Sequence, residues 1–383
     1  MPYLFETEEH DALRRQVARF AETSIAPHAM AYEEAGQFPR ELYRASAEAG
    51  VLGIGFPVEY GGSGGDITHQ IVAGEAMILH GRSVGTAVGL GSHAIALPPI
   101  LHLGSDAQKR HFAPKILHGE WISALAITEP DGGSDVAAIR TRASRQADHY
   151  VVQGSKLYIT SGCRADVVVT AVRTDPDLSK RHMGLSLLIV ERGSPGFAAS
   201  RKLHKMGWSA SDTAELTFAD CQVPVENRLG DEGSAFFAIL RNFAAERLLL
   251  ASQCVAIAQL AYDESVAFAK LRSTFGKPLA RHQVIRHKLA DMATQLAAAR
   301  SLVGECATRC QRGDVVMSQL AMCKNAATDM CSFGVDQAVQ IHGGLGYMRE
   351  TLVERLYRDA RLYPIGGGTR EIMNEIIAQA EGY

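Results

Sequence analysis

The chain has 383 residues, enough for two or three domains with full cores. Hydrophobic residues make up 46% and charged residues 21%, as in ordinary globular proteins in water. The formal net charge of -3 excludes the basic surface that nucleic acids or anionic membranes attract. The seven cysteines contain no Cys-x-x-Cys pair, which predicts reduced thiols in a reducing compartment.

The N-terminal segment, residues 1–9, is acidic and lacks the apolar region of a secretory signal peptide. No apolar run looks long enough to span a bilayer, so we expect no membrane span. These features predict a cytoplasmic, bacterial-like protein, or a mitochondrial-matrix protein if the sequence is a mature eukaryotic chain.

Residues 1–120 read as an N-terminal helical domain. Leu13, Val17 and Phe20 follow one helical stripe, and Leu42 and Ala45 begin another. Clusters of glycine and proline separate the predicted helices, at residues 53–57 and 61–66.

Residues 121–230 change character and read as a central β-domain. Short runs rich in β-branched residues lie between turns, without intervening helices, which predicts a β-barrel or a sandwich. The runs are residues 122–128, 150–152, 156–160, 167–172, 185–190 and 215–218.

Residues 231–383 return to helical periodicity and predict a bundle. Ser234 is placed to cap a long helix that ends near residues 276–278. A regular stripe of apolar residues from Ile285 to Val303 predicts a second helix. A third would end at residues 342–344.

One acidic residue, Glu246, interrupts the apolar face of the first long helix. At helical spacing it aligns with Ile239, Phe243, Leu250 and Ile257. A carboxylate on such a face is paired, protonated or functional, because burial penalises its charged form. One interpretation is an ion pair with a nearby arginine, Arg241 or Arg247. The other is a catalytic base with a raised pKa.

Two segments of the β-domain combine polar groups with conformational freedom. Residues 127–135 close a strand with a glycine-rich loop that carries Thr128 and Ser134. Residues 158–162 end another strand with Tyr158 beside Thr160. This pair would suit a flat heterocyclic cofactor, although an ordinary turn and a core aromatic residue would look the same.

Three further segments lie in the helical C-terminal part. Arg272 precedes a turn at residues 273–278, and could bind a pyrophosphate or complement a helix dipole. Residues 340–347 and 365–371 are rich in glycine, and the second has three consecutive glycines whose N–H groups could face a ligand oxygen. The nominal G-x-G-x-x-A at residues 89–94 lacks the strand–turn–helix context of a dinucleotide site. No metal site is predicted.

Taken in this order, the five segments resemble the acyl-CoA dehydrogenase family along essentially the whole chain. The resemblance implies an α+β fold with an N-terminal helical domain, a central β-barrel domain and a C-terminal four-helix bundle. It also implies FAD, an acyl-CoA thioester substrate, an electron-transfer flavoprotein as electron acceptor, and a homotetramer built as a dimer of dimers.

The resemblance also implies roles for single residues. Tyr158 and Thr160 would face the flavin, and Arg272, Phe275 and Gln283 would reach the FAD of a neighbouring subunit. The remaining cofactor positions are Leu125, Ile127, Thr128, Ser134, Gln340, Gly343, Gly344, Thr369 and Glu371. The positions implied for the substrate are Ser134, Phe243, Arg247 and Gly367.

The resemblance departs from the common family pattern at Gly367, where many members carry the catalytic glutamate. Long-chain and isovaleryl-type members carry it instead on the long helix, at the position of Glu246. The resemblance thus implies that Glu246 removes the α-proton while the β-hydrogen leaves as hydride to flavin N5. The Gly367 N–H would stabilise the thioester oxygen in the transition state.

Two alternatives remain open at this point. An acyl-CoA oxidase would reoxidise its flavin with oxygen, and a catalytically silent scaffold would only bind flavin or CoA. The acyl chain is expected to be long or branched. The bottom of its pocket is expected within residues 90–101, including His93, Pro98 and Pro99.

Overall fold

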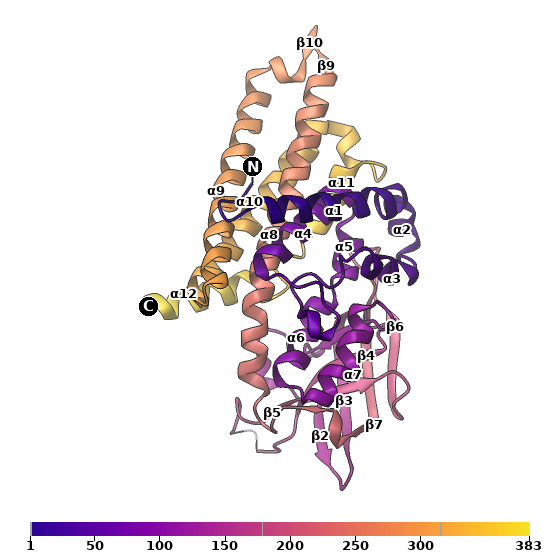
Figure 1. Cartoon of the computed structure of the whole chain (residues 1–383). Coiled ribbons are helices and arrows are strands. Elements are labelled where there is room, and N and C mark those ends of the chain that lie inside the picture. The colour runs from indigo at the N-terminus through magenta and orange to yellow at the C-terminus, as the bar shows by residue number, and fades with distance from the viewer. Residues whose placement is uncertain (1, 178, 315) are drawn as a thin grey trace.

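The computed structural model describes residues 2–177, 179–314 and 316–383. Helices come first, a block of strands follows, and long helices complete the chain, as the sequence predicted (Figure 1). The boundaries proposed at residues 120 and 230 stay a prediction.

Seven α-helices form the N-terminal part. The predicted stripes are largely buried, with Val17 and Phe20 on the first helix and Leu42 on the third. Asp66 begins α4 by accepting a hydrogen bond from the Thr68 N–H at 2.9 Å. The helices are α1 (Glu8–Ser24), α2 (Ala29–Ala35), α3 (Glu41–Glu48), α4 (Ile67–Gly81), α5 (Val84–Leu90), α6 (His93–Leu103) and α7 (Asp106–Leu117).

The middle of the chain forms one eight-stranded sheet in the order β6-β7-β3-β2-β4-β5-β8, with β1 parallel to β4. The strands are β1 (Ser123–Ala126), β2 (Arg142–Arg145), β3 (His149–Thr160), β4 (Val167–Arg173), β5 (Leu185–Glu191), β6 (Phe197–Lys202), β7 (Thr213–Pro224) and β8 (Arg228–Leu229).

The central strands are apolar on both sides because both faces of the sheet are covered. Alternate residues of β4 and β5, such as Val169 and Leu187, pack against α6 and α7. The intervening residues, such as Val168 and Leu188, share a second core with β3 and β7, so this face curls on itself. The sequence prediction of a central β-domain is therefore confirmed.

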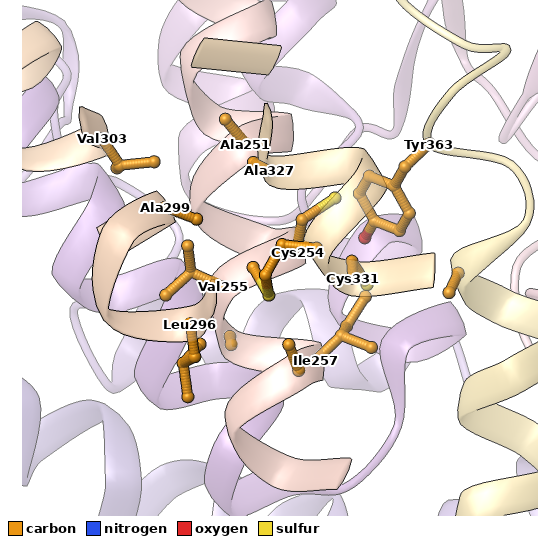
Figure 2. Packing of buried hydrophobic residues seen from close by; sticks show 14 of the residues in the cluster. Ala251, Cys254, Val255, Ile257, Leu296, Ala299, Val303, Ala327, Cys331 and Tyr363 are labelled. Carbon is orange, nitrogen blue, oxygen red and sulfur yellow. The ribbon is translucent and has the colours of Figure 1, made fainter. Parts of the chain in front are cut away.

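Five helices, α8 to α12, form the last part of the chain. They are α8 (Ala235–Leu271), α9 (Gln283–Gln311), α10 (Met317–His342), α11 (Leu352–Ala360) and α12 (Arg370–Glu381), with a short hairpin of β9 (Ser273–Thr274) and β10 (Lys277–Pro278) joining α8 to α9. Figure 1 shows α8 running from the sheet to this hairpin. Small and medium side chains, including Ala251, Val255, Leu296 and Val303, interlock α8 with α9 and α10 (Figure 2).

Two details of the long helix differ from the prediction. Ser234 occupies the N-cap position, but its hydroxyl donates to the Asp231 carbonyl at 2.6 Å and does not cap the helix. The helix ends at Leu271, before the predicted end at residues 276–278, because Arg272 is extended and the chain enters the β9–β10 hairpin.

The expectation about apolar runs also needs correction. Val84–Leu103 and Ala235–Leu271 are long and apolar enough to cross a membrane by length and composition alone. In each, 61% of the most apolar window is buried inside the protein. Packing against the rest of the fold thus accounts for their apolar character.

A buried ion pair anchors the loop that follows β1. The Lys156 ammonium, with no exposed side-chain surface, donates to Glu129 Oε1 at 2.8 Å and to the Ile127 carbonyl at 3.0 Å. Glu129 also accepts from the N–H groups of Arg140 at 2.7 Å and Thr141 at 2.8 Å. Burial alone would raise the pKa of Glu129, but Lys156 and these donors lower it. One carboxylate therefore ties both ends of the loop to β3.

Replacing Glu129 by alanine should destabilise the protein strongly, because Lys156 and the N–H groups of Arg140 and Thr141 would lose the carboxylate that they share. We expect a loss of about 3–5 kcal/mol in the free energy of unfolding. The measurement is urea unfolding followed by circular dichroism.

The matched control is Arg140→Ala. Its ion pair with Asp131, at 3.0 Å, joins side chains that are 77% and 72% exposed. Loss of this pair should cost less than about 1 kcal/mol. Equal destabilisation by the two substitutions would contradict the anchoring role of Glu129.

Candidate active site

Glu246 lies in the first half of α8, where the sheet, the N-terminal helices and the bundle meet. Its Oε2 atom is inaccessible to solvent and has no hydrogen-bond partner among the described residues. Burial raises the pKa of Glu246 to about 7, although the positive charges of Arg247 and Lys324 act in the opposite direction. The carboxyl group can therefore gain or lose a proton near neutral pH.

The ion pair considered for Glu246 is not observed. No described lysine, arginine or histidine nitrogen lies within 4 Å of its carboxylate. The guanidinium of Arg247 turns to the loop of residues 366–368, which we call the glycine loop, and its Nε donates to the Gly367 carbonyl at 3.2 Å. The nearest candidate cation is thus engaged with the backbone instead of the carboxylate.

The glycine loop passes directly beside the carboxylate. A Cβ built on Gly367 would lie 3.7 Å from Glu246 Oε1 and 2.6 Å from Leu250 Cδ1. The φ angle of Gly367 is 65°, a conformation that other residues rarely adopt. Gly367, the position where many members of the resembled family carry a carboxylate, therefore lies beside Glu246, which has one in this chain.

Lys324 on α10 is a member of this site that the sequence analysis missed. It is buried, its ammonium donates to the Gly368 carbonyl, and burial lowers its pKa to about 8. The available signal was weak, since Lys324 is a single lysine on a helix whose buried residues are mostly apolar but also include Asn325 and Thr328. Arg247 and Lys324 together hold two consecutive carbonyls of the glycine loop.

The structure brings the two β-domain segments together. The Leu157 N–H donates to the Thr128 carbonyl at 2.8 Å, which joins the end of β1 to β3. Next to it, Tyr158 is 66% exposed and has a φ of 63°. A large aromatic residue that is exposed and held in an unfavourable backbone conformation points to a functional role. Ser134 is exposed, and Leu125 and Thr160 are partly buried.

The implied partner-facing residues form a separate group at the far end of α8. Arg272, Phe275 and Gln283 are all exposed, and Phe275 is 97% exposed with a φ of 49°. Arg272 makes no ion pair with any described residue. At 1.5 Å per residue, the helix separates Arg272 from Glu246 by about 39 Å. Within one chain, these residues and Glu246 therefore do not form a single site.

The segment after α10 lies at the same end of the bundle. Gln340, Gly343 and Gly344 are exposed, and the ring of His342 stacks on Phe268 of α8 with centroids 4.3 Å apart. At the opposite side of the bundle, Thr369 caps α12 by accepting from the Ile372 N–H at 3.3 Å, and Glu371 is exposed.

A cavity of about 130 Å³ opens between α4, the segment around α5 and α8. The α8 residues that line it, Leu249, Ser252 and Gln253, begin one turn beyond Glu246. Most other lining residues are apolar. The expected region contributes Leu90, Gly91, His93 and Ala94, but Pro98 and Pro99 do not line it, which corrects that part of the prediction. Phe243 packs instead on the core between the helices and the sheet.

Comparisons with known proteins identify relatives along nearly the whole chain. Family models match three parts of the chain: the acyl-CoA dehydrogenase N-terminal domain over residues 7–120, the middle domain over 124–221, and the C-terminal domain over 235–382. The long-chain specific acyl-CoA dehydrogenase of Sus scrofa is 37% identical over 97% of this chain and 86% of its own length. Isovaleryl-CoA dehydrogenase of Pongo abelii is 35% identical over 98% and 89%.

Solved structures are similar over nearly the whole chain. A probable acyl-CoA dehydrogenase from Mycobacterium abscessus has a TM-score of 0.96 and 47% identity, covering 98% of this chain and 99% of that chain. Butyryl-CoA dehydrogenase from Megasphaera elsdenii has a TM-score of 0.93 and 35% identity, with full coverage of both chains.

Two other similar structures bear on cofactor and partner. A glutaryl-CoA dehydrogenase from Mycobacterium smegmatis, solved with FADH2, has a TM-score of 0.91 and 25% identity, covering 98% of this chain and 95% of that chain. A structure described as the electron transferring flavoprotein of Acidaminococcus fermentans has a TM-score of 0.94 and 35% identity over all of both chains. This chain belongs to the acyl-CoA dehydrogenase family, whose members are FAD-binding oxidoreductases.

Proposed function

We propose that the protein catalyses α,β-dehydrogenation of a saturated acyl-CoA thioester to the trans-2-enoyl-CoA, with Glu246 as the base. The observation that carries this proposal is the Glu246 carboxylate, which lies beside the glycine loop with its Oε2 inaccessible and unpartnered, and whose pKa is raised to about 7. A base for carbon acids needs such a pKa, because it must be ionised and still hold the proton it removes.

The glycine loop supports the second requirement of this reaction, which is stabilisation of negative charge on the thioester oxygen. The Gly367 N–H donates to no acceptor among the described residues, so it is free to stabilise negative charge on the thioester oxygen. Arg247 and Lys324 hold the loop through the carbonyls of Gly367 and Gly368 and so orient that N–H. Bound FAD supplies the hydride acceptor.

The cofactor residues are proposed from the same fold positions. Tyr158 and Thr160 face the flavin ring, and Thr128 and Ser134 lie on the adjoining loop. Leu125, Ile127, Thr369 and Glu371 complete the set on the same chain. Arg272, Phe275, Gln283, Gln340, Gly343 and Gly344 serve a neighbouring copy, which the distance from Glu246 along α8 supports.

The substrate class rests on the cavity beside Glu246 and on the helix position of the base. Both are compatible with a long or a branched acyl chain. Arg247 would lie near the thioester and Ser134 near the CoA part of the substrate, whereas Phe243 packs on the helix–sheet core and does not line the cavity. We propose an electron-transfer flavoprotein as acceptor and a homotetramer as the assembly. The cytoplasm, or the matrix for a mitochondrial form, is the compartment that suits these partners.

Glu246→Gln should leave the flavin bound and yellow but abolish its bleaching by acyl-CoA under anaerobic conditions, because the amide cannot accept the α-proton. Absorbance near the flavin maximum measures the reduction. Normal bleaching would refute the role of Glu246.

The control for that experiment is Glu305→Gln, which removes an exposed carboxylate on α9 and should bleach normally. Oxygen consumption during turnover separates the dehydrogenase from an acyl-CoA oxidase. In a catalytically silent scaffold, none of the acyl-CoAs would bleach the flavin.

The value of kcat/KM should rise with pH up to about 7 and then level off, because only ionised Glu246 removes the proton. Lys324→Met should move this inflection to higher pH, since the Lys324 charge lowers the pKa of Glu246. A profile that is flat from acid to neutral pH would exclude a titrating base at this site.

Arg272→Ala should lower the FAD content that survives gel filtration, because the exposed guanidinium is proposed to bind the cofactor of a neighbouring copy. Arg312→Ala, at the opposite end of α9, removes another exposed arginine and should retain the flavin. Equal flavin content in the two variants would exclude this role of Arg272.

A further inference from the structure

A glycine in the middle of α4 has no packing explanation. Gly74 lies in the interior of a helix, where glycine is less stable than alanine. A Cβ built on Gly74 would meet no atom within 4 Å. Alanine would therefore fit without a clash and would stabilise the helix.

Neighbouring glycines differ in this respect. A Cβ on Gly81 would lie 3.2 Å from Ile25, one on Gly85 would lie 3.1 Å from the Trp208 backbone, and one on Gly89 would lie 2.5 Å from the Phe38 ring. Close packing explains these three positions. It does not explain Gly74.

The open space beside Gly74 is the cavity described above. Gln70, Ala73, Gly74 and Met77 follow one face of α4 and line it. The opposite wall is α8, where Leu249 and Gln253 lie on the helix face that also carries Glu246. A chain that starts beside Glu246 and follows α8 therefore enters the space that Gly74 leaves open.

The polar side chains of this cavity are engaged with the protein itself. Gln253 Oε1 accepts from the Tyr363 hydroxyl at 3.0 Å, and the Ser252 hydroxyl donates to the Leu249 carbonyl at 2.8 Å. Both ring nitrogens of His93 contact backbone carbonyls, at 2.7 Å and 3.0 Å. The remaining lining is mainly apolar and suits an unsubstituted hydrocarbon.

We propose that Gly74 determines how long an acyl chain the enzyme accepts, by keeping the far end of the acyl cavity open. The inference rests on the proposed function and adds the class of substrate. Cavities of about 150 Å³ hold a molecule the size of benzene. The space of about 130 Å³ thus takes roughly six further carbon atoms of an unbranched chain.

The test compares wild type, Gly74→Ala and Gly74→Leu holoenzymes with straight-chain acyl-CoAs of increasing length. Both variants should lose kcat/KM for the longest substrates, by about four-fold for each methylene displaced from the cavity. Short substrates should react as in wild type. The melting temperature of Gly74→Ala should rise, because alanine favours the helix.

The matched control is Gly334→Ala on α10, where the new Cβ would make an ordinary 3.5 Å contact with Ala258. It should leave the chain-length profile unchanged. If Gly74→Leu fails to fold, Gly74→Ala still tests the inference with a single methyl group.

The two proposals fail in different ways. If no acyl-CoA bleaches the wild-type flavin, the proposed function fails, and the acyl assignment of the cavity fails with it. If wild type reacts and the Gly74 variants lose activity equally at all lengths, or not at all, only the role of Gly74 is overturned. Binding of acyl-CoAs to Glu246→Gln in each background, read from the flavin spectrum, separates a binding effect from a catalytic one.

Discussion

The candidate active site depends on a carboxylate, Glu246, that has one oxygen inaccessible to solvent and no counter-ion among the described residues. Two cations lie close enough to influence Glu246, but both are used elsewhere: Arg247 binds the Gly367 carbonyl and Lys324 binds the Gly368 carbonyl. If either cation paired directly with the carboxylate, the pKa of Glu246 would fall and its basicity would be lost. Hydrogen bonds to the glycine loop thus shape the loop and leave the base unpaired.

This arrangement brings together three segments that are far apart along the C-terminal part of the chain. Helix α8 carries Glu246, α10 carries Lys324, and the glycine loop comes from the segment before α12. In the sheet, the buried pair of Glu129 and Lys156 ties the loop after β1 to β3, the strand that carries Tyr158. The buried ion pair therefore stabilises the region in which an exposed aromatic ring is held on an unfavourable backbone conformation.

Periodicity in the sequence was sufficient to predict the helices and strands whose buried residues recur at regular spacing. The stripe from Ile285 to Val303 is the inner face of α9, and the unbroken apolar runs of β4 and β5 are strands covered on both sides. Helix ends were less predictable, because competing local bonds decide them. Ser234 has the side chain of a cap, yet its hydroxyl binds the Asp231 carbonyl.

Buried charges were the least predictable features of the site. Lys156, Glu129 and Lys324 gave no clear signal, since a lysine in the sequence reads as exposed until its partner across the fold is known. The same limit applies to the cavity. Pro98 and Pro99, which the sequence predicts at its floor, do not line it, whereas Gly74 of α4 does.

The sequence by itself determined the order of helices and strands, the family, and the presence of glycine at position 367 and glutamate at position 246, because these follow from local pattern and residue identity. Only the tertiary structure decided that Gly367 and Glu246 are neighbours, that the nearby cations bind backbone carbonyls, and that Gly74 lines a cavity between α4 and α8. Solvent exclusion and the pKa of a carboxylate depend on groups distant in the chain, and packing alone brings those groups together.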